Sequence, residues 1–187
     1  MKILIYSLVV FLLIGYICIF MKGMDHSRLD EAYRMFYIDD SLKYWADMKE
    51  LNTYRDNTVF RYNESGNFRN LGKGWLFVNE NATWCVGNES DFYLYIDEPD
   101  KPHEVVIDLA EDMGYKNYIT VNGVYQDDLT ISDNIATAII STNMHEGLNR
   151  IAICTDETVK DVDENNKNLY REDGRHNMYI KSIIVRY

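Results

Sequence analysis

The chain has 187 residues, of which 47% are hydrophobic, and a formal net charge of −11 at pH 7. This length allows one domain with a sizeable core and an appended segment, but it is too short for two ordinary domains. The excess of carboxylates repels phosphate backbones, so nucleic acid is not an expected partner.

An uncharged apolar run extends from Ile3 to Phe20. A helix rises about 1.5 Å per residue, so a run of this length just spans a hydrocarbon core of about 30 Å. A cleaved signal peptide would have a shorter apolar core and a small-x-small cleavage site, and this run offers neither. We therefore expect residues 1–23 to form an uncleaved, single-pass transmembrane anchor. The weak asymmetry of flanking charge favours a plasma-membrane protein with a cytoplasmic N-terminus and an extracellular C-terminal domain.

Two small residues, Ser7 and Gly15, lie within this run. Small side chains allow transmembrane helices to approach one another closely. Both residues are therefore candidates for docking against a multi-spanning membrane partner, and the alternative is that both face lipid.

Residues 24–57 form a predicted juxtamembrane helical segment. Apolar residues recur at helical spacing on both sides of a break at residues 39–41, which predicts two short amphipathic helices. Their apolar faces either pack on the following domain or contact a membrane surface or a protein partner. In the second case the docking candidates are four aromatic residues: Tyr33, Phe36, Tyr37 and Trp45.

Residues 58–187 contain strand patterns separated by turn residues. The predicted strands are 58–62, 92–96, 104–110, 117–125, 135–140, 148–154 and 178–186. Such short strands at regular intervals predict a mainly β fold, an antiparallel β-sandwich.

Two local features of this domain can be predicted more closely. Asn122-Gly123 lies between two strand patterns and supplies the residues that a tight primed hairpin turn needs, because both central positions require positive φ. In the last strand the apolar alternation changes phase between Ile180 and Ile183, which predicts a β-bulge near Lys181-Ser182.

No local motif supplies catalytic chemistry or a metal site. Carboxylates are plentiful without a distinctive pair, and the four histidines lack metal-ligand spacing, so we expect neither an enzyme nor a cofactor nor a metal. The acidic stretch 161–166 has the oxygen ligands that calcium accepts but lacks a calcium-loop pattern, so a solvated loop is the alternative. Cys85 and Cys154 either form a disulfide or are two buried thiols.

The tryptophans Trp75 and Trp84 are candidates for sugar binding. In sandwich domains that bind glycans, flat rings stack on the apolar faces of pyranose rings. Trp75 follows a glycine-rich turn, and Trp84 lies in a short extended stretch. The alternative is that one or both fill the core between the sheets.

The order of several motifs resembles a known group of domains. The series comprises Gly74-Trp75, Thr83-Trp84, Val121-Asn122-Gly123, Gly147-Leu148-Asn149-Arg150 and Asp173-Gly-Arg175. It is similar to the jelly-roll β-sandwich domains, of carbohydrate-binding-module type, that accompany bacterial membrane glycosyltransferases and cell-surface polysaccharide biosynthesis. The resemblance implies a jelly roll over residues 58–187. It also makes Asp173 and Arg175 candidates for sugar contact, with structural pairing of the two as the alternative.

Two functional hypotheses follow. The first is a membrane-anchored, non-catalytic accessory subunit of an extracellular polysaccharide synthase or export complex, whose partners are the polysaccharide and a multi-spanning membrane glycosyltransferase or synthase. The second is a structural protein-interaction module on the cell surface that binds no sugar.

Overall fold

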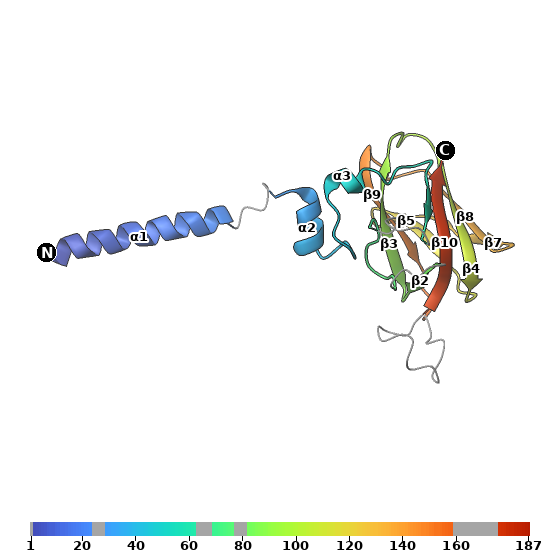
Figure 1. Ribbon diagram of the computed structural model, residues 1–187, viewed down its shortest axis with the longest axis horizontal. Helices are drawn as coiled ribbons and strands as arrows, with labels where there is room; N and C mark the ends of the chain where they lie inside the picture. Colours follow the sequence, from blue (N-terminus) through green and yellow to red (C-terminus); the bar gives the residue numbers. More distant parts are fainter. Residues whose placement is uncertain (1, 24–28, 63–68, 77–81, 159–175) are drawn as a thin grey trace.

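The computed structural model describes residues 2–23, 29–62, 69–76, 82–158 and 176–187. Figure 1 shows a long N-terminal helix, a short helical segment and a β-sandwich, in that order along the chain. The helices are α1 (Lys2–Gly23), α2 (Glu31–Tyr37) and α3 (Met48–Leu51).

The strands of the described residues form two antiparallel sheets. The six-stranded sheet contains β1 (Val59–Arg61), β2 (Thr83–Val86), β4 (His103–Asp112), β7 (Thr130–Ser132), β8 (Ile135–Ile140) and β10 (His176–Arg186). The four-stranded sheet contains β3 (Glu89–Ile96), β5 (Tyr118–Val121), β6 (Val124–Asp128) and β9 (Gly147–Cys154). The predicted antiparallel sandwich is confirmed.

The strand pairings define the topology. Early strands pair with late ones in a nested series, β2 with β10, β3 with β9 and β4 with β8, and the β5–β6 hairpin closes the series. The resulting orders, β2–β10–β4–β8 in one sheet and β3–β9–β5–β6 in the other, are those of a jelly roll. β1 extends the first sheet beside β2 along β10, and β7 extends it beyond β8.

The core lies between the two sheets and is built from alternate strand residues. Phe92, Leu94 and Ile96 of β3 are fully buried, as are Val105, Ile107 and Leu109 of β4. In β10 the register shifts between Ile180 and Ser182, at the predicted bulge. The extra residue keeps both Ile180 and Ile183 pointing into the core, which explains the phase change in the sequence.

The Asn122-Gly123 turn is confirmed as a hairpin. It joins β5 to β6, and both residues have positive φ, 50° for Asn122 and 83° for Gly123. A second device stiffens the turn, because the Asn122 side chain donates to Asn149 Oδ1 at 2.9 Å and accepts from the Arg150 backbone N–H at 3.0 Å.

The three cysteines are free. Cys85 belongs to the core between the sheets, whereas Cys154 alternates with the core residue Ile153 and lies on the other face of β9. Of the two alternatives for Cys85 and Cys154, the structure supports two buried thiols.

The helical segment packs on the outer face of the four-stranded sheet. Asp30 caps α2, because its carboxylate accepts from the backbone N–H of Ala32 at 3.0 Å. Ala32 and Met35 are buried in a second cluster with Tyr93 of β3. The two predicted helices exist but are short. The fully buried residues of α2 are Ala32 and Met35, and of the predicted aromatic residues only Phe36 packs partly against them.

The side chains of α1 from Val10 to Met21 are exposed and uncharged. The side chain of Ser7 lies outside the described residues, and Gly15 has no other residue within 4 Å of the position where a Cβ would be. Over the residues described, no helix has the combined length and apolarity of a membrane span.

Candidate functional site

Trp75 is a core residue. Its side chain lies inside the sandwich, with 2% of the residue exposed, and its ring is 5.8 Å from that of Tyr62. The indole N–H donates to the backbone oxygen of Asp91 at 2.6 Å, which satisfies its polar atom without solvent. A buried indole presents no face to a sugar ring, so the prediction of a platform at Trp75 gives way to the core alternative.

Trp84 lies on the outer face of the six-stranded sheet and is half-buried. Its ring stacks on that of Tyr179, the residue directly opposite on β10, with a centroid distance of 4.5 Å and an interplanar angle of 14°. The ring of His176 lies 4.6 Å away. Trp84 therefore remains a candidate aromatic platform, with one face already used by Tyr179.

Asp173 and Arg175 lie outside the described residues, and so does the acidic stretch 161–166.

The outer face of the four-stranded sheet carries a pair of tyrosines that the sequence analysis did not single out. Tyr118 and Thr120 alternate with the core residue Ile119, and Tyr125 is directly opposite Thr120, so Tyr118 and Tyr125 lie on the same face. The two rings are 5.6 Å apart at an angle of 46°. Tyr125 is 55% exposed, whereas Tyr118 is half-buried.

A carboxylate holds each of these rings in place. The Tyr118 hydroxyl donates to Asp156 Oδ1 and the Tyr125 hydroxyl donates to Asp128 Oδ1, both at 3.0 Å. Partial burial raises the pKa of Tyr118 to about 12, and the hydrogen bond to Asp156 acts in the same direction. The phenol therefore stays protonated at neutral pH, and the hydrogen bond to Asp156 orients its hydroxyl group in the absence of a ligand.

A pocket of about 360 Å³ opens beside Tyr118. Its lining combines one aromatic ring with charged and amide groups: Lys116, Asn117, Tyr118, Asp128, Leu129, Asp156 and Glu157. The volume is within the range of small-ligand sites, and the polar groups offer both donors and acceptors.

Further polar groups lie on the same face, across β9. Glu89 and Tyr118 are both directly opposite Cys154, so they share a face. The guanidinium of Arg150 binds Glu89 and also Asp91, with 2.5 Å between Arg150 Nε and Asp91 Oδ2. Burial raises the pKa of Asp91, while Arg150 acts in the opposite direction. This face thus presents aromatic rings together with carboxylates and one guanidinium.

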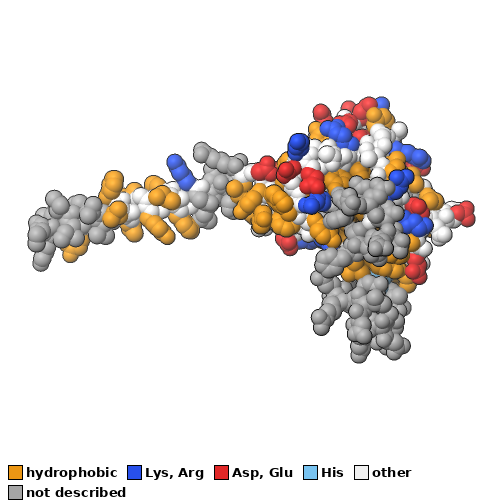
Figure 2. All heavy atoms as spheres, in the orientation of Figure 1, with side chains coloured by type: hydrophobic (Ala, Val, Ile, Leu, Met, Phe, Trp, Pro, Cys, Tyr) orange, Lys and Arg blue, Asp and Glu red, His pale blue; other side chains and the backbone are white. Residues whose placement is uncertain are grey.

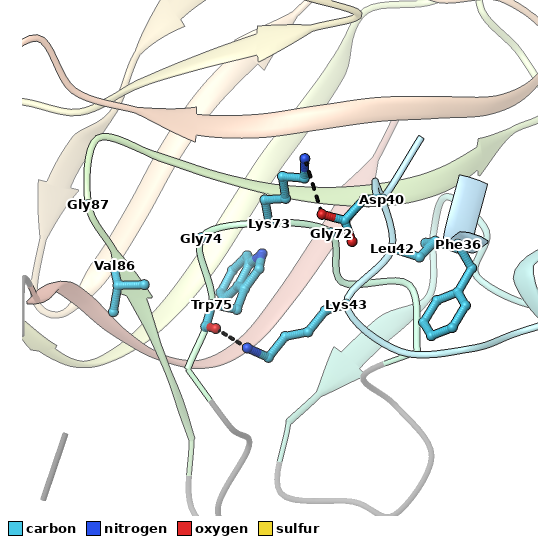
Figure 3. A pocket seen from close by; sticks show the side chains of 10 residues that line it. All are labelled: Phe36, Asp40, Leu42, Lys43, Gly72, Lys73, Gly74, Trp75, Val86 and Gly87. Carbon is cyan, nitrogen blue, oxygen red and sulfur yellow. Dashed lines mark hydrogen bonds and ion pairs between the residues drawn. The ribbon is translucent and has the colours of Figure 1, made fainter. Parts of the chain in front are cut away.

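A second pocket, of about 800 Å³, lies between the helical segment and the sandwich (Figure 3). Phe36 and Leu42 form its wall on one side, and the stretch from Gly72 to Trp75 forms the other. The ammonium of Lys43 donates to the backbone oxygen of Trp75. Lys73 Nζ lies 3.8 Å from Asp40 Oδ2. Both ammonium groups are thus engaged within the protein, which makes this pocket the weaker candidate.

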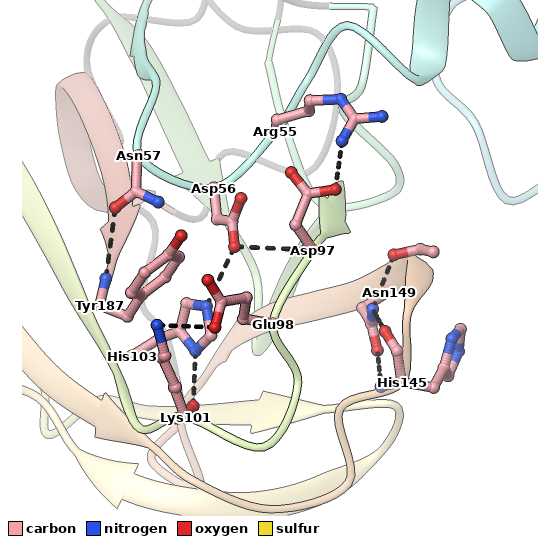
Figure 4. A network of polar contacts seen from close by, with 11 residues as sticks. Arg55, Asp56, Asn57, Asp97, Glu98, Lys101, His103, His145, Asn149 and Tyr187 are labelled. Atoms are coloured by element: carbon pink, nitrogen blue, oxygen red, sulfur yellow. Dashed lines mark hydrogen bonds and ion pairs between the residues drawn. The ribbon is translucent and has the colours of Figure 1, made fainter.

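A buried Asp–His pair lies elsewhere in the sandwich (Figure 4). His103 Nε2 is 3.1 Å from Asp56 Oδ2, and His103 Nδ1 is 2.8 Å from the backbone oxygen of Lys101. Both side chains are almost completely inaccessible to solvent. Because both ring nitrogens are used inside the protein, this pair is structural and offers no base to a substrate.

The four predicted docking residues come together in one aromatic cluster. The contacts are Tyr33–Tyr37 at 4.7 Å, Phe36–Tyr37 at 4.9 Å, Tyr37–Trp45 at 5.6 Å and Phe36–Trp45 at 5.7 Å between ring centroids. Figure 2 shows hydrophobic side chains gathered over the helical segment beside α1.

No protein-family model matches the chain. No curated protein matches it either. Among solved structures, a CBM35 from Paenibacillus barcinonensis is 12% identical with a TM-score of 0.41, covering 69% of this chain and 98% of that one. A family 35 carbohydrate binding module from Clostridium thermocellum is 15% identical with a TM-score of 0.37, covering 59% and 85%. An exo-beta-1,3-galactanase from Phanerochaete chrysosporium is 15% identical with a TM-score of 0.35, covering 61% and 24%. These likenesses are remote, so the fold is assigned here from the strand pairings.

Proposed function

We propose that the chain is a non-catalytic glycan-binding protein that recognises sugar on the outer face of its four-stranded sheet. The observation that carries this proposal is the pair Tyr118 and Tyr125, whose rings share that face and are each held by a carboxylate. The pocket beside Tyr118 extends the surface in the direction of Glu157.

The chemistry of this surface suits a carbohydrate. A pyranose ring has apolar C–H faces that stack on aromatic rings, and hydroxyl groups that donate to carboxylates. Tyr125 offers an exposed ring, and Asp128 and Asp156 retain acceptor capacity beyond the bond that each takes from a tyrosine. Because these bonds fix the rings in advance, little side-chain entropy is lost on binding.

Calorimetric titration of the full chain with a panel of bacterial polysaccharides tests this proposal. Tyr125→Ala removes the exposed ring, and we expect its affinity for the cognate glycan to fall about tenfold or more, equivalent to about 1.4 kcal/mol. Tyr37→Ala is the matched control, because Tyr37 is 61% exposed and lies in the helical segment. Equal affinity of Tyr125→Ala and the original chain, or binding to no polysaccharide, would overturn the proposal.

We further propose that α1 anchors this domain at the plasma membrane, with the sandwich outside the cell. The support is the uncharged run Ile3–Phe20 in the sequence and the exposed apolar side chains from Val10 to Met21. A helix that is apolar on all sides needs an apolar environment. On this proposal the chain is an accessory subunit of a polysaccharide synthase or export complex, and its partner is a multi-spanning membrane glycosyltransferase.

A helix exchange tests the accessory role. Replacing Ile3–Phe20 with an unrelated transmembrane helix of equal length keeps the tether and removes the surface around Ser7 and Gly15. We expect loss of the copurifying synthase from mild detergent extracts and lower polymer output. If both stay unchanged, α1 is only a tether.

A further inference from the structure

We propose that the aromatic cluster formed by Tyr33, Phe36, Tyr37 and Trp45 lies in the lipid interface, at the boundary between head groups and acyl chains. This inference rests on the proposed insertion of α1 in a membrane. From the sequence, these four residues are candidates for docking on a protein partner. On the present proposal their rings contact lipid instead.

Three rings of the cluster, Tyr33, Tyr37 and Trp45, lie on the side of α2 that the sandwich leaves open, whereas Phe36 packs partly against the buried residues of the helical segment. Ala32 and Met35 point toward the sheet and are buried there. Tyr33 and Tyr37 are one helical turn apart on another side of α2, and their rings are 4.7 Å from each other. Trp45 joins them from the stretch after the helix, 5.6 Å from Tyr37. The helical segment therefore has one face for the protein and one face without a partner among the described residues.

The open face is apolar and accessible. The exposed fraction is 61% for Tyr37, 42% for Tyr33 and 39% for Trp45. Leu29 and Ile38 extend it, with exposed fractions of 39% and 41%. Contiguous apolar surface of this kind marks a contact with another molecule or with a membrane.

The position of this face in the chain identifies the contact. Residues 24–28 separate the end of α1 at Gly23 from Leu29. An extended chain covers at most about 3.5 Å per residue, so Leu29, where this face begins, lies within about 20 Å of the end of α1. If a membrane surrounds the exposed apolar side chains of α1, its surface lies near the C-terminal end of that helix. The aromatic face then begins close to the membrane surface. α2 is also the first element after α1 (Figure 1).

The chemistry of the residues favours lipid over protein. Tyrosine and tryptophan concentrate at both surfaces of a bilayer, because each has an apolar ring and one polar atom. Three of the four rings in the cluster are of these two types. The carboxylates of Asp30, Glu31 and Asp39 lie beside the cluster in sequence, and among the ion pairs of the described residues only Asp39 pairs with a cation of α2, Arg34. They disfavour an anionic surface, so the expected lipid is zwitterionic.

Tryptophan fluorescence provides the test, because the chain has three tryptophans in different environments. The full chain is reconstituted in phosphatidylcholine vesicles whose acyl chains carry bromine either near the head group or near the chain end. We expect bromine near the head group to quench part of the emission more strongly. Trp45→Phe should abolish that quenching, whereas Trp84→Phe should retain it, since Trp75 and Trp84 belong to the sandwich.

Vesicle flotation separates this inference from the anchoring proposal. If the chain does not float with the vesicles, both are overturned. A second outcome is that the chain floats with the vesicles while bromine quenches Trp45 neither in the original chain nor in Trp84→Phe. In that case only the interfacial position of the cluster is overturned, and the cluster is a protein-docking surface. The Trp84→Phe chain keeps the test informative even if Trp45→Phe fails to fold.

Discussion

Two tryptophans, nine positions apart, differ in what they contribute to folding. The Trp75 indole fills the core and bonds Asp91, whereas Trp84 lies on the outer face against Tyr179. Truncation of a buried tryptophan to alanine costs about 3–5 kcal/mol, and loss of an outer aromatic pair costs about 1 kcal/mol beyond its buried area. We therefore expect Trp75→Ala to lower the free energy of unfolding far more than Trp84→Ala, as measured by urea denaturation. Equal losses would contradict this assignment of core and surface.

The buried pair of Asp56 and His103 is expected to matter more than a nearby exposed pair. Removal of Asp56 leaves His103 Nε2 buried without its hydrogen-bond partner, and an unsatisfied buried polar group costs about 1–3 kcal/mol. Arg55 and Asp97 form an ion pair in which both side chains are more than 40% exposed, and such a pair contributes little because water and salt screen it. Asp56→Ala should thus reduce the unfolding free energy severalfold more than Asp97→Ala. A similar effect of the two variants would show that the pair contributes little.

Asp91 predicts a pH dependence of stability. Burial raises its pKa in the folded chain, so the folded state holds the proton more tightly than the unfolded state does. The resulting stabilisation is complete below the unfolded pKa of about 3.9 and is lost as pH rises through the folded pKa. Asp91→Asn lacks this titration. We expect the cost of Asp91→Asn, measured by denaturation, to be larger at pH 3 than at pH 7; the reverse order would mean that Arg150 lowers the pKa of Asp91.

Among the connecting elements, two glycines with positive φ are expected to differ in their tolerance of a side chain. A Cβ at Gly123 would meet no atom within 4 Å, so substitution there costs only the backbone strain of φ 83°, about 1–2 kcal/mol. A Cβ at Gly74 would lie 1.9 Å from the backbone oxygen of Glu89 and would force the loop from the sheet. Gly74→Ala should therefore lower the thermal midpoint much more than Gly123→Ala. Equal midpoints would contradict the close approach of the loop to β3.

The strands were predictable where alternation was complete. The pattern predicted β8 with its observed bounds, the β5–β6 hairpin from Asn122-Gly123, and the bulge in β10 from a single change of phase. It missed β7, which is only three residues long and has one apolar residue, Ile131. A strand this short contributes too few side chains to the core to leave a periodic signal.

The candidate sugar face was not predictable to the same extent. Alternation around Ile119 places Tyr118 outside the core, so half of the pair was within reach of the sequence. The face of Tyr125 was within reach as well, because a two-residue turn at Asn122-Gly123 pairs Thr120 with Tyr125. The register shift between Ile119 and Thr120, which affects how far apart the two rings lie, is indicated by no residue type in the hairpin. The residue type makes Trp75 a candidate platform, but the burial of a side chain depends on how the whole sandwich packs, and Trp75 lies inside it.

At the scale of the whole molecule, the two ends of the four-stranded sheet differ in what covers them. Its outer face is covered near β3 by the helical segment, through Met35, Leu51 and Tyr93. The strands β5 and β6 at the opposite edge carry Tyr118 and Tyr125. The segment that leads from α1 thus leaves the β5–β6 edge open for a ligand, and the proposed sugar face and the proposed membrane contact do not compete for the same surface.

The most direct test of the glycan-binding account is a titration of the isotopically labelled chain with an oligosaccharide of the cognate polysaccharide, followed by amide chemical shifts. The account predicts that the shifting amides gather on β5, β6 and the stretch from Cys154 to Glu157, around Tyr118 and Tyr125. Shifts confined to β2 and β10, around Trp84 and Tyr179, or no shifts at saturating oligosaccharide, would contradict it.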